Sequence, residues 1–368
     1  MHNAAQIANH YRLLAATLEP LRSLIDDPAV VEIMCNGSGE VWFESSGEMS
    51  RAECEIADQA IQSAAMALTS QAGRSAIAGT ESGIVDAEIP LAAVASPGAR
   101  AGGNMRVAVV MTPTALRGSA MSIRKHNPRV LSLDDYFASG SFSPSGTGRP
   151  KQSNTLPASL ADIAGGGRPL FDLIRWIVRN RYTVLISGAT GSGKTTFFKA
   201  LIKEIPDAER LLTIEDTPEL VVNSPNFVSL VSNVQTGVTP ARLVKLAMRM
   251  RPDRILLGEL RDATALDFLE AANTGHPGSI ATLHANDGLR ALTRLETLAL
   301  QAGIGDSNSI RSRILDTVDF VVQVAKDGRP GMVEEVLQVT RHGHANNDLS
   351  SNTRTLFSRY ATPTGAHS

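Results

Sequence analysis

The sequence is poor in cysteine, in long apolar runs and in aromatic side chains. Its two cysteines, Cys35 and Cys54, are too few for a disulfide framework or a four-thiolate zinc site, so we interpret both as buried free thiols. No apolar run approaches the roughly 18 residues that a membrane-spanning helix needs. The N-terminus also lacks a basic stretch followed by an apolar core, which a secretion signal would require. These absences predict a cytoplasmic protein.

Neither sign of charge dominates the chain. The 368 residues contain 35 Lys and Arg against 37 Asp and Glu, and the formal net charge is −2. This balance is unlike that of proteins whose main role is to bind nucleic acid, and we expect no sequence-specific nucleic-acid partner. The length and the hydrophobic fraction of 43% predict a soluble globular protein with about two or three domains.

One stretch, residues 182–204, has the pattern of a strand, a glycine-rich turn and a helix. The turn fits G-x-x-x-x-G-K-[ST] with Gly188, Gly193, Lys194 and Thr195. Glycines let successive backbone N–H groups turn toward phosphate oxygens, while the lysine reaches the β- and γ-phosphates and the threonine hydroxyl can ligate Mg²⁺. We therefore predict ATP and Mg²⁺ as ligands. The predicted phosphate cradle is Gly188, Ala189, Thr190, Gly191, Ser192, Gly193, Lys194, Thr195 and Thr196.

Residues 1–137 are predicted to form an α+β domain with a mainly antiparallel sheet. Two of its strand candidates place arginines, Arg106 and Arg124, among apolar neighbours. An arginine in a strand is often simply solvated on the open face of a sheet. Guanidinium also suits bidentate phosphate recognition, so a contact with the γ-phosphate is the alternative.

A change of composition separates this domain from the rest. Residues 138–167 are rich in Ser, Gly and Pro, and we predict a flexible linker there. Fully extended, residues 138–158 could reach on the order of 70 Å, enough to place the first domain over a neighbouring subunit. Residues 168–340 have an α/β pattern, and the polar tail 341–368 is predicted to be disordered.

Three apolar strand candidates beyond the phosphate loop end in polar or charged residues: Glu215 with Asp216, Glu259, and His284. Open α/β sheets bind ligands at the carboxyl ends of their strands, so these side chains should lie near the nucleotide. Together with Thr195, Glu259 is a candidate to hold Mg²⁺, either directly or through a water.

The roles of these residues stay open at this point. Glu259 could also orient the attacking water, with Glu215 as the rival general base. A salt bridge with Arg254 or Arg261 is the structural alternative for Glu259. His284 could sense the γ-phosphate or be structural, and a structural role is favoured for His276.

Four segments together resemble the Walker A, Asp, Walker B and His boxes of the bacterial secretion ATPase superfamily: Gly188–Thr196, Ile214–Asp216, Arg249–Arg261 and Thr274–Ala285. Within it, Glu32–Asn36, Glu40–Phe43 and Ser122–Lys125 are similar to the hexameric traffic ATPases of type IV secretion and conjugation systems. The resemblance covers roughly residues 18–137 and 168–340.

The resemblance implies a RecA-like P-loop NTPase domain in the C-terminal part, beside the smaller α+β domain. It also implies a homohexamer that hydrolyses ATP to power substrate export or pilus assembly. Such a motor would lie at the cytoplasmic face of the inner membrane, with channel proteins and other secretion ATPases as partners. The resemblance assigns the γ-phosphate contact to Arg106 and Arg124, the Asp-box acid to Glu215, the Walker B acid to Glu259 and the His-box histidine to His284.

Three alternatives remain. A pilus-retraction or type II secretion motor belongs to the same superfamily, although type II motors usually carry a four-cysteine zinc motif that this chain cannot build. A nucleic-acid translocase would share the ATPase core, but the charge balance disfavours it. The third is a nucleotide-gated scaffold without catalysis, which the joint presence of Lys194, Thr195, Glu215 and Glu259 disfavours.

Overall fold

The computed structural model describes residues 4–71, 75–97, 102–126, 156, 163, 165–327, 329–340 and 348–360. The chain divides into two compact units, Met1–Ser153 and Asn154–Ser368. The division falls inside the predicted linker, much of which lies outside the described residues. Within the described part of the chain, no helix has the length and apolar character needed to cross a membrane.

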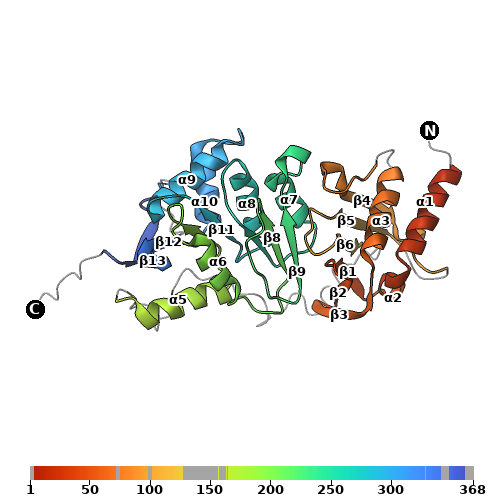
Figure 1. Ribbon diagram of the computed structural model, residues 1–368, viewed down its shortest axis with the longest axis horizontal. Coiled ribbons are helices and arrows are strands. Elements are labelled where there is room, and N and C mark those ends of the chain that lie inside the picture. Colours follow the sequence, from red (N-terminus) through yellow and green to blue (C-terminus); the bar gives the residue numbers. More distant parts are fainter. Residues whose placement is uncertain are drawn as a thin grey trace, which may run out of the picture. The chain divides into compact units, whose positions relative to one another are not determined.

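The first unit is built on a six-stranded antiparallel sheet, as the sequence predicts, with strand order β3-β2-β1-β6-β5-β4. Its strands are β1 (Val30–Cys35), β2 (Glu40–Ser45), β3 (Glu48–Glu55), β4 (Ile84–Pro90), β5 (Asn104–Val110) and β6 (Ala120–Lys125). Its α-helices are α1 (Ala4–Thr17), α2 (Arg22–Asp26) and α3 (Asp58–Gln71), drawn in red and orange in Figure 1.

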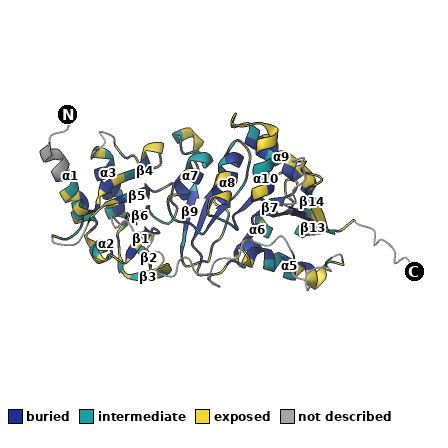
Figure 2. Cartoon of the chain, turned by 180° about the vertical axis from the view of Figure 1, so that it is seen from behind, coloured by how far each residue is buried: buried dark blue, intermediate teal, exposed yellow. Residues whose placement is uncertain are grey.

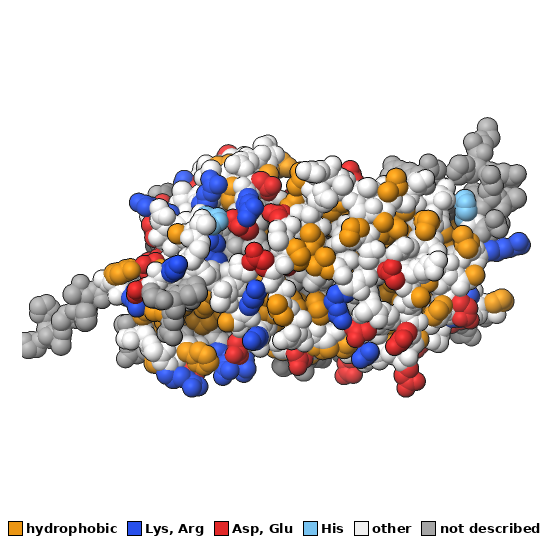
Figure 3. Space-filling view, in the orientation of Figure 1, with side chains coloured by type: hydrophobic (Ala, Val, Ile, Leu, Met, Phe, Trp, Pro, Cys, Tyr) orange, Lys and Arg blue, Asp and Glu red, His pale blue; other side chains and the backbone are white. Residues whose placement is uncertain are grey.

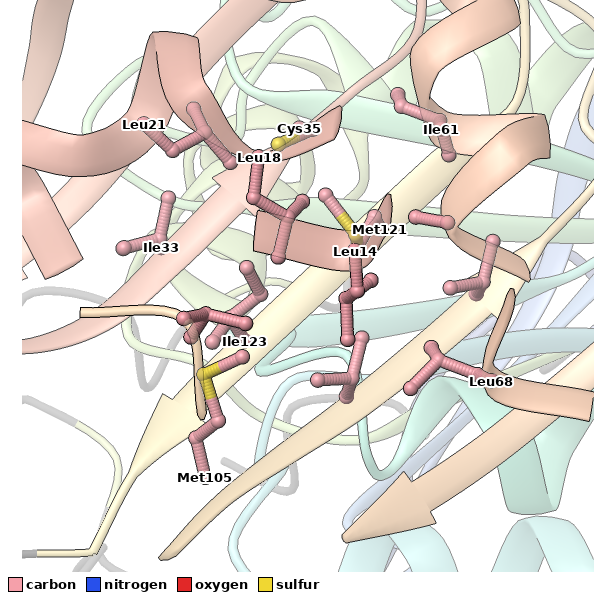
Figure 4. Close-up of a cluster of buried hydrophobic side chains, with 14 of the residues drawn as sticks. Leu14, Leu18, Leu21, Ile33, Cys35, Ile61, Leu68, Met105, Met121 and Ile123 are labelled. Carbon is pink, nitrogen blue, oxygen red and sulfur yellow. The ribbon is translucent and has the colours of Figure 1, made fainter. Parts of the chain in front are cut away.

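One face of this sheet packs against the helices. Alternate strand residues such as Ile33, Met121 and Ile123 meet leucines of α1 and α3, including Leu14 and Leu68, in one buried cluster (Figure 4). Because side chains alternate along a strand, the residues between them lie on the opposite face. Neither cysteine forms a disulfide bond; Cys35 is buried in this cluster as predicted, whereas Cys54, also predicted to be buried, is only half-buried.

The second unit contains an eight-stranded sheet with the order β14-β13-β12-β7-β11-β10-β8-β9. The strands from β12 to β9 are parallel, and β13 and β14 extend the sheet antiparallel. The bounds are β7 (Val184–Ser187), β8 (Leu211–Glu215), β9 (Phe227–Val231), β10 (Arg254–Leu257), β11 (Ile280–Leu283), β12 (Phe320–Asp327), β13 (Arg329–Val339) and β14 (Thr353–Ser358).

Helices cover both faces of this sheet, so the central strands are buried on both sides (Figure 2). Helix α6 contacts β7 and β13, α7 contacts β8, α8 contacts β10, and α9 contacts β7, β12 and β13, while α10 packs against α8 and α9. The helices are α5 (Gly167–Arg179), α6 (Lys194–Ile202), α7 (Pro240–Ala247), α8 (Thr264–Asn273), α9 (Gly288–Leu300) and α10 (Ser307–Thr317). A parallel sheet between two helical layers is the RecA-like α/β architecture that the resemblance implies.

Two boundaries differ from the sequence prediction. The tail 341–368 was predicted to be disordered, but Thr353–Ser358 form β14, which pairs with β13. An edge strand needs only one apolar face, so about half of its residues are polar. A segment of this composition resembles a disordered tail when only the sequence is considered. At the end of the predicted linker, Ile163 is buried in the core of the second unit and Leu156 packs against that core. Residues 341–347 and 361–368 lie outside the described residues.

Candidate active site

The phosphate loop joins β7 to α6 at the carboxyl edge of the sheet, and its conformation depends on glycine. Gly191 and Gly193 have φ values of 73° and 92°, which favour glycine over other residues. At Gly188 a Cβ would collide with Ser192 Oγ and the carbonyl oxygen of Val324. The glycines of the motif are therefore required by this fold of the loop.

Lys194 begins α6, and its side chain bends back over the loop. Its ammonium group donates to the carbonyl oxygens of Gly188 and Ala189, at 2.9 and 3.0 Å, and lies 3.1 Å from Nδ1 of His284. Burial lowers the pKa of Lys194, and the carboxylate charge of Glu259 opposes this effect. The lysine is thus held where phosphate oxygens would replace carbonyl oxygens as acceptors.

His284, one residue beyond β11, connects Lys194 to Glu259. An ammonium group can only donate, so Nδ1 of His284 accepts the bond from Lys194. The proton of the neutral imidazole is then on Nε2, which lies 3.0 Å from Oε1 of Glu259 and donates to it. The two contacts together select one tautomer of His284.

Glu259 follows β10 and has a second partner in Arg261, whose Nη2 donates to Oε2 at 2.7 Å. Burial acts to raise the pKa of Glu259, but the hydrogen bond from Arg261, the interaction with His284 and the charges of Arg261 and Lys194 outweigh it and lower the pKa. The carboxylate therefore stays ionised. Its salt-bridge partner is Arg261 and not Arg254, which is fully buried and bonded to Glu209.

Glu215 is the last residue of β8, and it caps the turn that follows. Its Oε1 accepts the backbone N–H groups of Glu219 and Leu220, both at 2.9 Å. Burial raises the pKa of Glu215, while these two hydrogen bonds oppose the rise. Glu215 thus fixes the local backbone at the edge of the sheet.

Thr195, Glu215 and Glu259 line one pocket of about 120 Å³, together with Asp216 and Arg261. Hydroxyl and carboxylate oxygens are the ligands that Mg²⁺ prefers. The donor set in this pocket therefore suits a divalent ion beside the phosphate loop. The structure brings together Lys194, Thr195, Glu215, Glu259 and His284, as the strand-end pattern predicts.

The sequence analysis named Arg261 as a possible partner of Glu259 and placed Asp216 near the nucleotide, but it did not predict that Arg261 also pairs with Asp216. Arg261 lies 3.6 Å from Asp216 as well as bonding Glu259, and Asp216 accepts a hydrogen bond from Ser232 at 2.6 Å. His276 is structural, with Nδ1 2.8 Å from the carbonyl oxygen of Ala271.

Arg106 and Arg124 belong to the first unit and are cross-strand partners on β5 and β6. Arg106 makes a bidentate bond with Asp86 at 2.9 and 3.0 Å, and Arg124 bonds Glu32 at 2.7 Å. The arginine side chains are 42% and 50% exposed. Each guanidinium is therefore held by an acid yet open to solvent, which fits either of the two roles considered for it.

Comparison with known proteins identifies the family. The model of the family described as "Type II/IV secretion system protein" matches residues 149–347. The conjugal transfer protein TrbB of Rhizobium radiobacter is 34% identical over 93% of this chain and 94% of its own. The type IV secretion system protein VirB11 of Bartonella quintana is 33% identical over 87% of this chain and 92% of its own.

A solved structure agrees with these relatives. It is the crystal structure of the VirB11 ATPase from the Brucella suis type IV secretion system in complex with sulphate. This structure has a TM-score of 0.77 and 30% sequence identity, and the match covers 91% of this chain and 96% of that one. The chain belongs to the type II/IV secretion system protein family, as an ATPase motor of the type IV secretion and conjugation branch.

Proposed function

We propose that this chain is a homohexameric, Mg²⁺-dependent ATP hydrolase that powers export or pilus assembly at the cytoplasmic face of the inner membrane. Its partners would be channel proteins and other secretion ATPases, and not a specific nucleic-acid sequence. The proposal rests on one observation, a continuous series of side-chain contacts that runs from Lys194 through His284 and Glu259 to Arg261. Glu259 and Arg261 line the same pocket as Thr195. Family membership supports the motor role.

The phosphate chain of ATP would displace the carbonyl oxygens that now accept from Lys194. Thr195 and Glu259 would hold Mg²⁺, because they line one pocket and Glu259 is kept ionised. When bound, Mg²⁺ offsets negative charge on the β- and γ-phosphates. If Lys194 bonded to phosphate, its hydrogen bond to His284 would break. The contact between His284 and Glu259 would then depend on whether nucleotide is bound.

Glu259 is better placed than Glu215 to orient the attacking water. Glu215 already uses Oε1 to cap two backbone N–H groups, so moving that carboxylate would disrupt the turn after β8. The partners of Glu259, in contrast, are side chains that can rearrange. We therefore assign water activation to Glu259 and a positioning role to Glu215.

Arg106 and Arg124 are proposed to contact the γ-phosphate from the first unit. Their acids, Asp86 and Glu32, hold the guanidinium groups on one face of the sheet while leaving them half exposed. The part of the predicted linker that precedes Leu156 would join the two units and allow the first to serve its own or a neighbouring subunit.

The charge pattern supports the absence of a dedicated nucleic-acid surface. On the face of the second unit turned to the viewer in Figure 3, basic and acidic side chains are interspersed. Several of the described arginines are also paired with acids, among them Arg175 with Glu204 and Arg313 with Glu270. A steep salt dependence of DNA-stimulated hydrolysis would instead favour a translocase.

Glu259→Gln tests the assignment. The amide keeps the size of the side chain but cannot act as a carboxylate, so we expect ATP binding to persist while hydrolysis falls by about 10²-fold or more. The matched control is Glu270→Gln, the same change at an exposed position on α8, which should hydrolyse ATP at the wild-type rate. If Glu259→Gln hydrolysed ATP at the wild-type rate, Glu259 would have no part in the catalytic step.

A further inference from the structure

A second pocket of about 570 Å³ lies in the second unit and takes no part in the chemistry proposed above. Its walls are the glycine run 165–167 at the start of α5, residues 331–333 of β13 and residues 357–359 around the end of β14. This volume falls in the range of roughly 300–1,000 Å³ typical of small-molecule sites. The pocket is therefore large enough for a ligand of nucleoside size.

This pocket adjoins the phosphate loop through Gly331. The backbone N–H of Gly331 donates to the carbonyl oxygen of Ser192 at 2.7 Å. A Cβ built on Gly331 would lie 3.5 Å from the carbonyl oxygen of Gly193. The wall formed by β13 thus touches the loop that is proposed to hold the phosphates.

The strand order shows which end of the nucleotide would point this way. The strand of the phosphate loop, β7, lies between β11 and β12. Glu215 and Glu259 follow β8 and β10, on the β11 side, so the reacting γ-phosphate points there. The nucleoside end of ATP must leave on the other side, past β12 and β13, where the second pocket lies.

The lining suits a flat base and a sugar. Phe357 supplies an aromatic ring, and Leu170, Met332 and Val333 supply apolar surface. Gly166 approaches this ring so closely that a Cβ there would lie 3.2 Å from it, and its φ of 66° also favours glycine. Arg359, the charged residue of the lining, lies 2.8 Å from the carboxylate of Asp327, which offsets its positive charge.

We propose that this pocket receives the base and ribose of the nucleotide, and that β14 completes it by contributing Phe357. The inference rests on the proposed function, since it extends the same nucleotide site. The proposal assigns a function to β14, which lies beyond residues 149–347, the part of the chain matched by the family model. The C-terminal strand then determines nucleoside affinity and leaves phosphate affinity unchanged.

The test compares ADP with inorganic pyrophosphate, both with Mg²⁺, in calorimetric titrations of the full chain. The two probes share the phosphate groups and differ in the nucleoside. The Phe357→Ala variant lacks the aromatic contact with the base, so it should bind ADP about tenfold more weakly than the wild type and bind pyrophosphate equally well. Phe357→Tyr keeps the ring and should restore ADP affinity, and Thr355→Ala, an exposed position on the same strand, should match the wild type.

Each other outcome has a distinct meaning. If wild type binds neither probe, the proposed function fails and this inference fails with it. If wild type binds ADP and Phe357→Ala binds it equally well, the pocket assignment is overturned while the ATPase proposal stands. Equal losses for ADP and pyrophosphate, with a lower melting temperature, would show that Phe357 only supports the fold, which also overturns the assignment.

Discussion

At the scale of single residues, the site is defined by the direction of its hydrogen bonds. Lys194 donates to His284, His284 donates to Glu259, and Arg261 donates to the other oxygen of the same carboxylate. Every donor in this chain points toward Glu259, so the negative charge of Glu259 is stabilised by all of them. A change at Lys194 can therefore reach Glu259 through one imidazole ring.

This linkage predicts the pH dependence of a His284 variant. The interaction with His284 is one of the causes that lower the pKa of Glu259, so His284→Ala should raise that pKa. Protonation of Glu259 would then occur at higher pH, and the acidic limb of the hydrolysis rate should shift upward. The measurement is the rate of ATP hydrolysis between about pH 4 and 8.

His276→Ala is the control, since His276 bonds a backbone carbonyl and has no part in the Lys194 chain. Its acidic limb should coincide with that of the wild type. An acidic limb that stays in place in His284→Ala would show that His284 does not act on Glu259.

Glu215 gives a prediction about stability. Glu215→Gln keeps an oxygen that can accept the two backbone bonds, whereas Glu215→Ala removes both and should cost about 1–3 kcal/mol of unfolding free energy. The pKa of Glu215 is raised in the fold, so the wild type loses stability as pH rises through the window above the ordinary glutamate pKa. The stability of Glu215→Gln relative to wild type should therefore increase across that window.

Urea unfolding of the three proteins at several pH values measures this. A Glu215→Ala variant as stable as wild type would contradict the capping role. If Glu215→Gln lost stability relative to wild type as pH rose, the direction of the pKa shift would be wrong.

The residue scale also shows what the sequence could reveal. A glycine-rich loop is predictable because only certain residues tolerate its backbone angles, and strand ends are predictable because parallel strands finish at one edge. The cap made by Glu215 and the second bond of Arg261 were not predictable. Both depend on side-chain directions that spacing along the chain does not determine.

At the scale of elements, one buried ion pair joins β10 to the segment before β8. Arg254 is fully buried, and its Nε and Nη2 bond the two oxygens of Glu209 at 2.8 and 2.7 Å. Its Nη1 also donates to the carbonyl oxygen of Val178 at the end of α5. The pair therefore links three elements around the base of the phosphate-loop strand.

Removing the acid should leave a buried, uncompensated charge. We expect Glu209→Ala to lower the unfolding free energy by about 3–5 kcal/mol, as measured by denaturant titration. Glu204→Ala is the comparison, since Glu204 pairs with the more exposed Arg175 and Arg179, and it should cost much less. Equal effects of the two changes would mean that burial does not govern the strength of these pairs.

The phosphate-loop strand and helix and the strands that lead to Glu215, Glu259 and His284 were predicted from the sequence, whereas the segment of β14 was predicted to be disordered. The central strands read as continuous apolar runs because helices cover both faces of the sheet. In β14, Arg354 and Thr355 are exposed, and the strand is stabilised by its antiparallel pairing with β13. A short polar segment of this kind becomes a strand only because a partner edge is available, which composition cannot show.

At the scale of the whole molecule, the central claim is that the chain is an ATP-driven ring. The two-unit organisation follows from the change of composition near residue 138, but the number of subunits follows only from family resemblance. A ring would allow hydrolysis in one subunit to act on its neighbours. Assembly and turnover must therefore be measured on the same sample.

The most direct measurement is steady-state ATP hydrolysis by the purified chain beside Lys194→Ala, with particle mass recorded for both. The account predicts particles of six subunits that hydrolyse ATP, and turnover reduced to background in the variant, because the ammonium group that binds the phosphates is gone. Equal hydrolysis by both proteins would contradict the assigned site. Two inactive, monomeric proteins would contradict the ring motor itself.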